Sequence, residues 1–182
     1  MPAMKSKFFL YAALLLLTQC SKCKQDDPTP EEQLPPITQT GANTFGCLVN
    51  GQVWMPKGSD GTSNFSVSYD ATYAQGTLSV ATYRRLGSGP NEVQTISIVS
   101  DSMRAAGRYT IRSMGRHGVQ FTDRSKGCTY YLRDQITYSR GVIIIKRLDL
   151  QAGIISGQFE VTLATPGCDT IRITQGRFDK KL

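Results

Sequence analysis

The stretch from residue 84 to residue 147 is the part of this sequence best equipped to bind an anion. Its cationic residues are Arg84, Arg85, Arg104, Arg108, Arg112, Arg116, Arg124, Lys126, Arg133, Arg140, Lys146 and Arg147. The acidic residues of the same stretch are Glu92, Asp101, Asp123 and Asp134. A guanidinium group can fork onto a carboxylate or a phosphate, so this composition favours an acidic polysaccharide, phosphate groups or an acidic protein as ligand. The alternative is that these arginines only cover the solvent faces of strands and loops.

Aromatic side chains could add a stacking surface for sugar rings. Tyr130 and Tyr131 are neighbours, and neighbouring strand residues point to opposite faces of a sheet, so at least one of them is expected to be exposed. We predict ligand contacts for Tyr130, Tyr131, Arg108 and Arg112. The remaining candidates, expected to fill sheet faces or the core, are Trp54, Tyr69, Tyr73, Tyr83, Tyr109 and Tyr138.

Catalytic chemistry has few candidates. His117 is the single histidine, and a Ser-His-Asp or Cys-His mechanism would need it as the base. Since no Gly-x-Ser-x-Gly turn accompanies it, we interpret His117 as a turn residue between strands. Paired carboxylates could hydrolyse glycosides without a histidine. The candidates are Asp60, Asp70, Glu92, Asp101, Asp123, Asp134, Asp149, Glu160, Asp169 and Asp179. Spacing places no two of them in one cleft, so we predict no catalytic residue.

Metal and nucleic-acid functions are not expected. The segment 60–64 carries oxygen ligands but lacks the spaced acids of a calcium loop. One histidine and no paired CxxC motifs argue against zinc, so no metal and no cofactor are predicted. The basic residues come without a nucleic-acid-binding motif.

The five cysteines suit an oxidising compartment. Cys20 and Cys23 precede the expected domain, which leaves Cys47, Cys128 and Cys168 inside it. Cys47 lies in an apolar alternation and is expected to be a buried thiol. Cys128 and Cys168 each follow a glycine at an expected loop edge, so we predict a disulfide between them, while other pairings of the three remain open.

Alternation of apolar and polar residues with a period of two recurs through the chain and predicts strands. It is found at residues 45–49, 65–69, 78–81, 95–98, 107–112, 158–163 and 171–174. Residues 142–145 are apolar throughout, which indicates a central strand packed on both faces. Asn50-Gly51 predicts a type I′ hairpin turn. About ten short strands predict an all-β fold, either an antiparallel sandwich or a partly closed barrel. One short helix is expected at residues 100–106.

The N-terminus predicts export. Lys5 and Lys7 precede an apolar run at residues 8–17. This run is too short to span a bilayer as a helix but fits the h-region of a signal peptide. The residues Leu-Thr-Gln-Cys that end at Cys20 resemble a bacterial lipobox, in which the cysteine becomes the lipidated, palmitate-bearing first residue. A plain secretory peptide with an unmodified Cys20 is the alternative.

We therefore predict a signal peptide at residues 1–19, a lipidated N-terminus with a flexible proline-rich tether at 20–43, and a single all-β domain at 44–182. Lysines and an acidic pair follow Cys20, and this pattern is similar to the signals of Bacteroidetes lipoproteins that reach the cell surface. The expected location is thus the outer membrane, at the cell surface, with the periplasmic leaflet as the alternative.

Three segments carry a family resemblance: FGCLVNGQVW at 45–54, ISGQFEV at 155–161 and IRITQGRFD at 171–179. Together with the N-terminal signal, they resemble uncharacterised lipoproteins of the Bacteroidetes. The resemblance implies the location in the outer membrane and the all-β fold, and it identifies no catalytic residue. We expect a non-enzymatic module that binds glycan or an acidic partner, which predicts an exposed aromatic flanked by arginines from residues 104–147. The alternatives are a structural or interaction subunit of an envelope assembly and, less favoured, a hydrolase.

Overall fold

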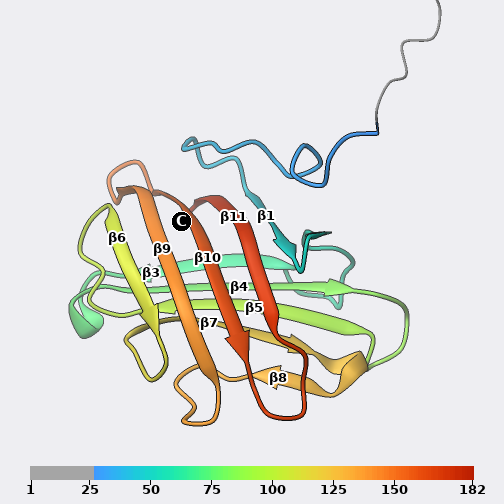
Figure 1. Cartoon of the computed structure of the whole chain (residues 1–182). Helices are drawn as coiled ribbons and strands as arrows, with labels where there is room; N and C mark the ends of the chain where they lie inside the picture. Colours follow the sequence, from blue (N-terminus) through green and yellow to red (C-terminus); the bar gives the residue numbers. More distant parts are fainter. Residues whose placement is uncertain (1–26) are drawn as a thin grey trace, which may run out of the picture.

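Two antiparallel sheets pack face to face in the computed structural model, which describes residues 27–182 (Figure 1). The six-stranded sheet has the order β2 (Gln52–Trp54), β1 (Thr44–Val49), β11 (Ile171–Lys181), β10 (Ile154–Ala164), β9 (Tyr138–Asp149) and β6 (Gly107–Arg112). The five-stranded sheet has the order β3 (Phe65–Asp70), β4 (Thr77–Arg85), β5 (Val93–Ser100), β7 (His117–Asp123) and β8 (Cys128–Tyr130). This confirms the predicted all-β fold, and of the two predicted architectures it is the sandwich.

The core lies between the inner faces of the two sheets. Phe45 of β1 brings several rings together, because its centroid lies 5.8 Å from that of Trp54, 5.6 Å from that of Phe65 and 5.6 Å from that of Phe159. Burying an apolar side chain of this size contributes roughly 1.5–3 kcal/mol. The thiol of Cys47 is free and fully buried beside this cluster, as predicted, and its burial raises its pKa.

The β1–β2 hairpin also follows the prediction. Asn50 and Gly51 have φ angles of 49° and 79°, and Val49 pairs with Gln52, as a two-residue type I′ turn requires. The Asn50 side chain then ties the hairpin to β11, since its Oδ1 accepts a hydrogen bond of 2.7 Å from the backbone N–H of Arg172. One local pattern therefore fixes both a turn and its place in the sheet.

Residues 100–106 do not form the predicted helix. Ser100 is the last residue of β5, and Met103 is fully buried in the core. The Met103 N–H donates to the carbonyl of Gly76, and the Tyr69 hydroxyl donates to the carbonyl of Met103 at 2.6 Å. These long-range contacts outweigh the local helical preference. Among the described residues, helical structure comprises the short 3₁₀ turns Tyr73–Gln75 and Arg124–Lys126.

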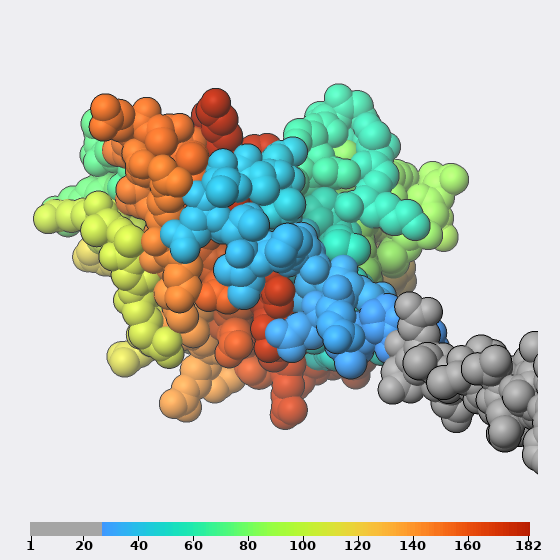
Figure 2. Space-filling view, turned by 90° about the horizontal axis from the view of Figure 1, so that it is seen from above, coloured from blue at the N-terminus to red at the C-terminus, as the bar shows by residue number. Residues whose placement is uncertain are grey.

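Residues 34–43, which we call the N-terminal strap, lie against the sandwich before β1 begins. Figure 2 shows the segment in blue, resting on the C-terminal strands. Leu34 is buried, and Pro35 packs so closely on Gly46 that a Cβ at Gly46 would meet its Cδ at 2.7 Å. Asp179 of β11 accepts hydrogen bonds from Thr38, Thr40, Gly41 and Ala42. The prediction of a flexible tether up to residue 43 is therefore wrong for the strap.

The predicted disulfide is present. It joins Cys128 on β8 of one sheet to Cys168 in the loop that precedes β11 of the other. The predicted signal peptide and lipid anchor at Cys20 lie outside the described residues. Among residues 27–182, no helix has the length and hydrophobicity needed to cross a bilayer.

Candidate functional site

Four arginines converge on the outer face of the six-stranded sheet. Strand pairing places Arg112 of β6 opposite Arg140 of β9, Arg140 opposite Thr162 of β10, and Thr162 opposite Arg172 of β11. Paired strands lie about 4.8 Å apart, so this row crosses four strands over roughly 14 Å. Arg108 lies four residues before Arg112 on β6 and thus on the same face. We call the four arginines and the surface between them the arginine face.

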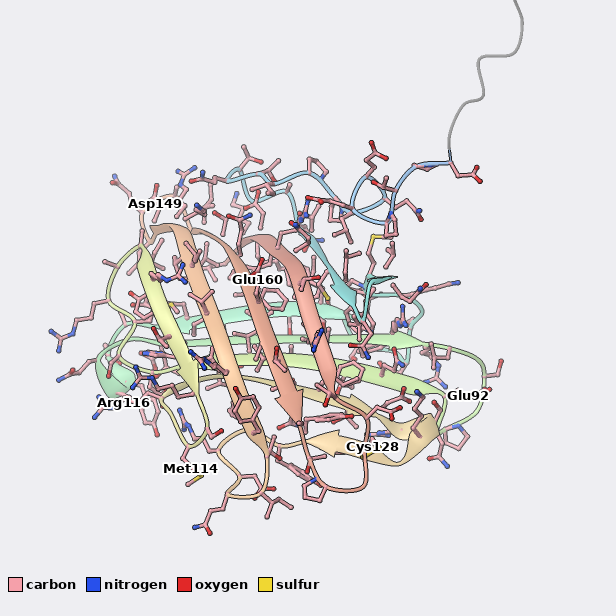
Figure 3. All side chains as sticks on the ribbon, viewed as in Figure 1. Glu92, Met114, Arg116, Cys128, Asp149 and Glu160 are labelled. Carbon is pink, nitrogen blue, oxygen red and sulfur yellow. A yellow bond between two sulfur atoms is a disulfide. The ribbon has the colours of Figure 1, made fainter. Side chains whose placement is uncertain are left out.

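The arginine face is hollowed into an open groove of about 840 Å³. Val142 of β9 contributes to its floor and is half-buried, while Ile143 faces the core. The predicted packing of residues 142–145 on both faces is therefore wrong on the outer side, where Val142 borders the open groove. Polar neighbours of the arginines in the groove are Thr110, Thr162, Thr174 and Glu160, the last of which is labelled on β10 in Figure 3.

Within residues 27–182, the arginines of the arginine face have no ion-pair partner, although Glu160 lines the same groove. The side chains of its four arginines make no ion pair and donate no hydrogen bond within residues 27–182. By contrast, Arg133 pairs with Asp101 and Arg147 with Asp149. Like charges directly opposite each other on a sheet are unfavourable. A bound anion would relieve the repulsion between Arg112 and Arg140.

An exposed aromatic borders the same groove. Tyr138 begins β9, is 49 % exposed and lies on the same face as Arg140, two residues further along the strand. An exposed aromatic flanked by arginines is what the binding hypothesis predicts, although the sequence did not single out Tyr138. The alternation of Tyr138, Arg140 and Val142 is the signal that could have found it.

Of the four predicted ligand contacts, the two arginines line the groove and the two tyrosines do not. Arg108 and Arg112 both line the groove, as expected. Tyr130 is 1 % exposed and its hydroxyl donates to the carbonyl of Asp169, so the prediction that it offers a contact on the surface is wrong. Tyr131 is 57 % exposed, which confirms that one of the two tyrosines faces solvent, but it does not line the arginine face.

His117 is the first residue of β7, so its predicted place in a turn is wrong. Its Nδ1 lies 2.6 Å from Oγ of Ser100, and its ring meets that of Tyr109 edge to face at 5.2 Å. Desolvation lowers the pKa of His117 and outweighs the opposing charge of Asp101. The Ser100 hydroxyl in this pair is fully buried and out of reach of a substrate.

The groove of the arginine face does not bring carboxylates together either. Glu160 is the single acid that lines the groove, and Asp179 lies beneath the N-terminal strap. In the part of the chain that the structure describes, no three His, Cys, Asp or Glu residues are grouped to hold a metal ion.

Comparison of the chain with protein-family models, with curated proteins and with solved structures finds no match. The functional argument therefore depends on the geometry of the arginine face.

Proposed function

We propose that this protein is an outer-membrane lipoprotein, anchored through Cys20 and displayed at the cell surface, that binds an acidic glycan on its arginine face without altering it chemically. The observation that supports this proposal best is the row of Arg112, Arg140 and Arg172 across four strands, which forms no ion pair within residues 27–182 and has Tyr138 at its border. The N-terminal signal supports the location.

The chemistry of the groove suits an acidic glycan. Guanidinium groups recognise carboxylates through charge-assisted hydrogen bonds, and the hydroxyl groups of Thr110, Thr162 and Thr174 can exchange hydrogen bonds with sugar hydroxyls. The exposed ring of Tyr138 offers a flat apolar surface for a sugar ring. Because the groove is open along the sheet, a chain of several sugars can lie in it.

Binding of polygalacturonate, which carries one carboxylate per sugar, tests the proposal against neutral dextran. The full chain with Cys20→Ser, which prevents lipidation, is titrated by calorimetry at low and at physiological ionic strength. Arg140→Gln should weaken polygalacturonate binding about tenfold, since a hydrogen bond to a charged group contributes roughly 1.5–3 kcal/mol. The matched control is Arg124→Gln, which removes the same charge from the exposed turn beyond β7 and should change the affinity less than twofold.

The stability of Arg140→Gln separates binding from folding. Removing the charge opposite Arg112 should leave the free energy of unfolding unchanged or raise it by about 0.2–1 kcal/mol. Tyr138→Ala should weaken binding while leaving its salt dependence intact. Equal losses in Arg140→Gln and Arg124→Gln, or equal binding of dextran, would refute the proposal.

An interaction subunit of an envelope assembly is a second candidate. Met114 and Tyr131 are 55 % and 57 % exposed and line one shallow depression beside the β6–β7 turn. Exposed apolar groups of this kind favour a protein contact. Cross-linking on intact cells from a cysteine at Met114, compared with one at Ser66 on β3, would reveal a partner specific to this end of the sandwich.

A further inference from the structure

A second cleft opens at one end of the sandwich, near Cys128 in Figure 3. It lies between the β1–β2 hairpin of one sheet and strands β4, β5, β7 and β8 of the other, and its volume is about 240 Å³. Its apolar lining comes from Val49, Phe121, Tyr130 and Ile171. None of the residues that line it also lines the arginine face, so the two sites are separate.

Arg84 brings a fixed positive charge to this cleft. Its Nε donates to Oε1 of Gln94 at 2.8 Å, and its Nη1 donates to the carbonyl of Val53 at 3.0 Å. Its guanidinium carbon lies 5.6 Å from the centre of the Trp54 ring, which is buried beside it. Nη2 donates no hydrogen bond to the described residues. Arg84 is thus held rigidly and keeps one donor nitrogen for a ligand.

The other charges of the cleft limit what can bind. Asp123 is 4 % exposed and already accepts hydrogen bonds from Gln94 at 2.6 Å and from the Ser125 N–H at 3.1 Å. At the rim of the cleft, Nζ of Lys126 lies 3.9 Å from Oδ2 of Asp169. Two cations and two carboxylates therefore line the cleft, so the pocket is close to neutral overall. One added negative charge can pair with Arg84, whereas a dianion would meet repulsion from Asp123.

The wall of the cleft is fixed before any ligand arrives. The loop that precedes β11 is tied to β8 by the disulfide between Cys128 and Cys168 and by the hydrogen bond from the Tyr130 hydroxyl to the carbonyl of Asp169. A site whose walls are already ordered loses less entropy when it binds a small ligand. An apolar cleft with a few convergent polar groups is the usual form of a small-molecule site.

We propose that this cleft binds a small organic monocarboxylate with an apolar body. The carboxylate accepts from Nη2 of Arg84, and the apolar body rests against Val49 and Ile171. This site is independent of glycan binding on the arginine face.

Benzoate is a suitable probe, with benzyl alcohol as its neutral counterpart and phenyl phosphate as its dianionic one. The chain contains one tryptophan, so the indole N–H of Trp54 gives one assignable signal in a ¹H–¹⁵N spectrum of the full chain with Cys20→Ser. Benzoate should shift this signal saturably, with a Kd in the millimolar range. Benzyl alcohol and phenyl phosphate should each bind at least fivefold more weakly. Equal shifts from all three compounds, or benzoate shifts confined to the arginine face, would overturn the proposal.

Two variants sharpen the test. Arg84→Met removes the guanidinium and keeps an unbranched side chain that reaches about as far as Nε, and it should weaken benzoate binding at least fivefold. Arg85→Met is the matched control, because neighbouring strand residues face opposite ways and Arg85 does not line the cleft. If Arg84→Met does not fold, the comparison of the three probes on the unaltered cleft decides the question. Equal affinities of benzoate for Arg84→Met and Arg85→Met would contradict the role of Arg84.

Discussion

Replacing Asp179 by alanine should release the N-terminal strap. Asp179 is 1 % exposed, and the four shorter hydrogen bonds to its carboxylate come from Oγ1 of Thr38 at 2.7 Å and from the N–H groups of Thr40 at 2.8 Å, Gly41 at 2.8 Å and Ala42 at 3.2 Å. No lysine, arginine or histidine of residues 27–182 forms an ion pair with it. Residues 38–42 of the strap are therefore held mainly by hydrogen bonds to a single buried charge, with a further one from Arg147 to the carbonyl of Gln39 at 2.7 Å.

The size of the effect follows from two opposing quantities. Four hydrogen bonds to a charged acceptor, at roughly 1.5–3 kcal/mol each, would give about 6–12 kcal/mol if the donors stayed buried and unpaired. A released strap instead exposes its donors to water and regains conformational entropy of about 1–2 kcal/mol per residue. We therefore expect Asp179→Ala to lower the free energy of unfolding by about 3 kcal/mol.

Urea unfolding of the full chain with Cys20→Ser measures this loss, and hydrogen exchange locates it. The amides of Thr40, Gly41 and Ala42 should lose protection in Asp179→Ala while the strands keep theirs. Asp70→Ala is the matched control, because Asp70 accepts hydrogen bonds from Thr72 and Tyr73 within its own exposed turn and should cost below about 1 kcal/mol.

Protonation of Asp179 at low pH should lower the free energy of unfolding, as Asp179→Ala does. Burial raises the pKa of Asp179, but the hydrogen bonds from the strap outweigh it, and the net shift is downward from 3.8. The contribution of the ionised Asp179 carboxylate to the free energy of unfolding is therefore complete above the pKa that this group has in the unfolded chain. It is lost as the pH falls through the pKa of Asp179 in the folded protein, which lies below 3.8. A cost below about 1 kcal/mol, with the strap amides still protected, would refute the reasoning, since the strap would then be held by other contacts.

Two further predictions concern stability. Replacing Cys128 and Cys168 by serine should cost about 4 kcal/mol in urea unfolding, because the bridge closes a loop with a sequence separation of 40; a loss below about 1 kcal/mol would contradict the loop-entropy argument. Desolvation lowers the pKa of His117 from 6.5, so its contribution to stability is complete above that pH and is lost as the pH falls through the folded pKa; His117→Gln should flatten this dependence below pH 6.5, and an unchanged profile would show that another group titrates.

Patterns that act over a few residues were predictable from the sequence. Asn50-Gly51 predicts its hairpin because the positive φ angles are a property of the two residues themselves. Cys47 is buried as its apolar alternation indicates. Strand β7 was missed although Val119 and Phe121 alternate with polar residues, and the predicted helix at 100–106 failed because Met103 is drawn into the core.

Features that depend on distant pairing were only partly predictable. The sequence identified Arg108 and Arg112 as candidates. They share a face with Arg172 only because β6, β9, β10 and β11 lie side by side, and no local sequence pattern predicts this strand order. The alternation of side chains along a strand places Tyr130 and Tyr131 on opposite faces, but it does not show which of the two faces the core. The strap was missed because a proline-bearing polar segment gives no sign of a buried carboxylate more than 130 residues away.

The place of β11 in the six-stranded sheet makes the two ends of the described chain depend on each other. This strand lies between β1 and β10, and Thr38 donates to Asp179, an acceptor 141 residues further along the chain. While β11 is absent from the sheet, β1 and β10 each present an unpaired edge that other chains can join. A chain that lacks residues 171–181 therefore cannot complete this sheet or hold the N-terminal strap in place, so loss of this one strand exposes two edges and a terminus at once.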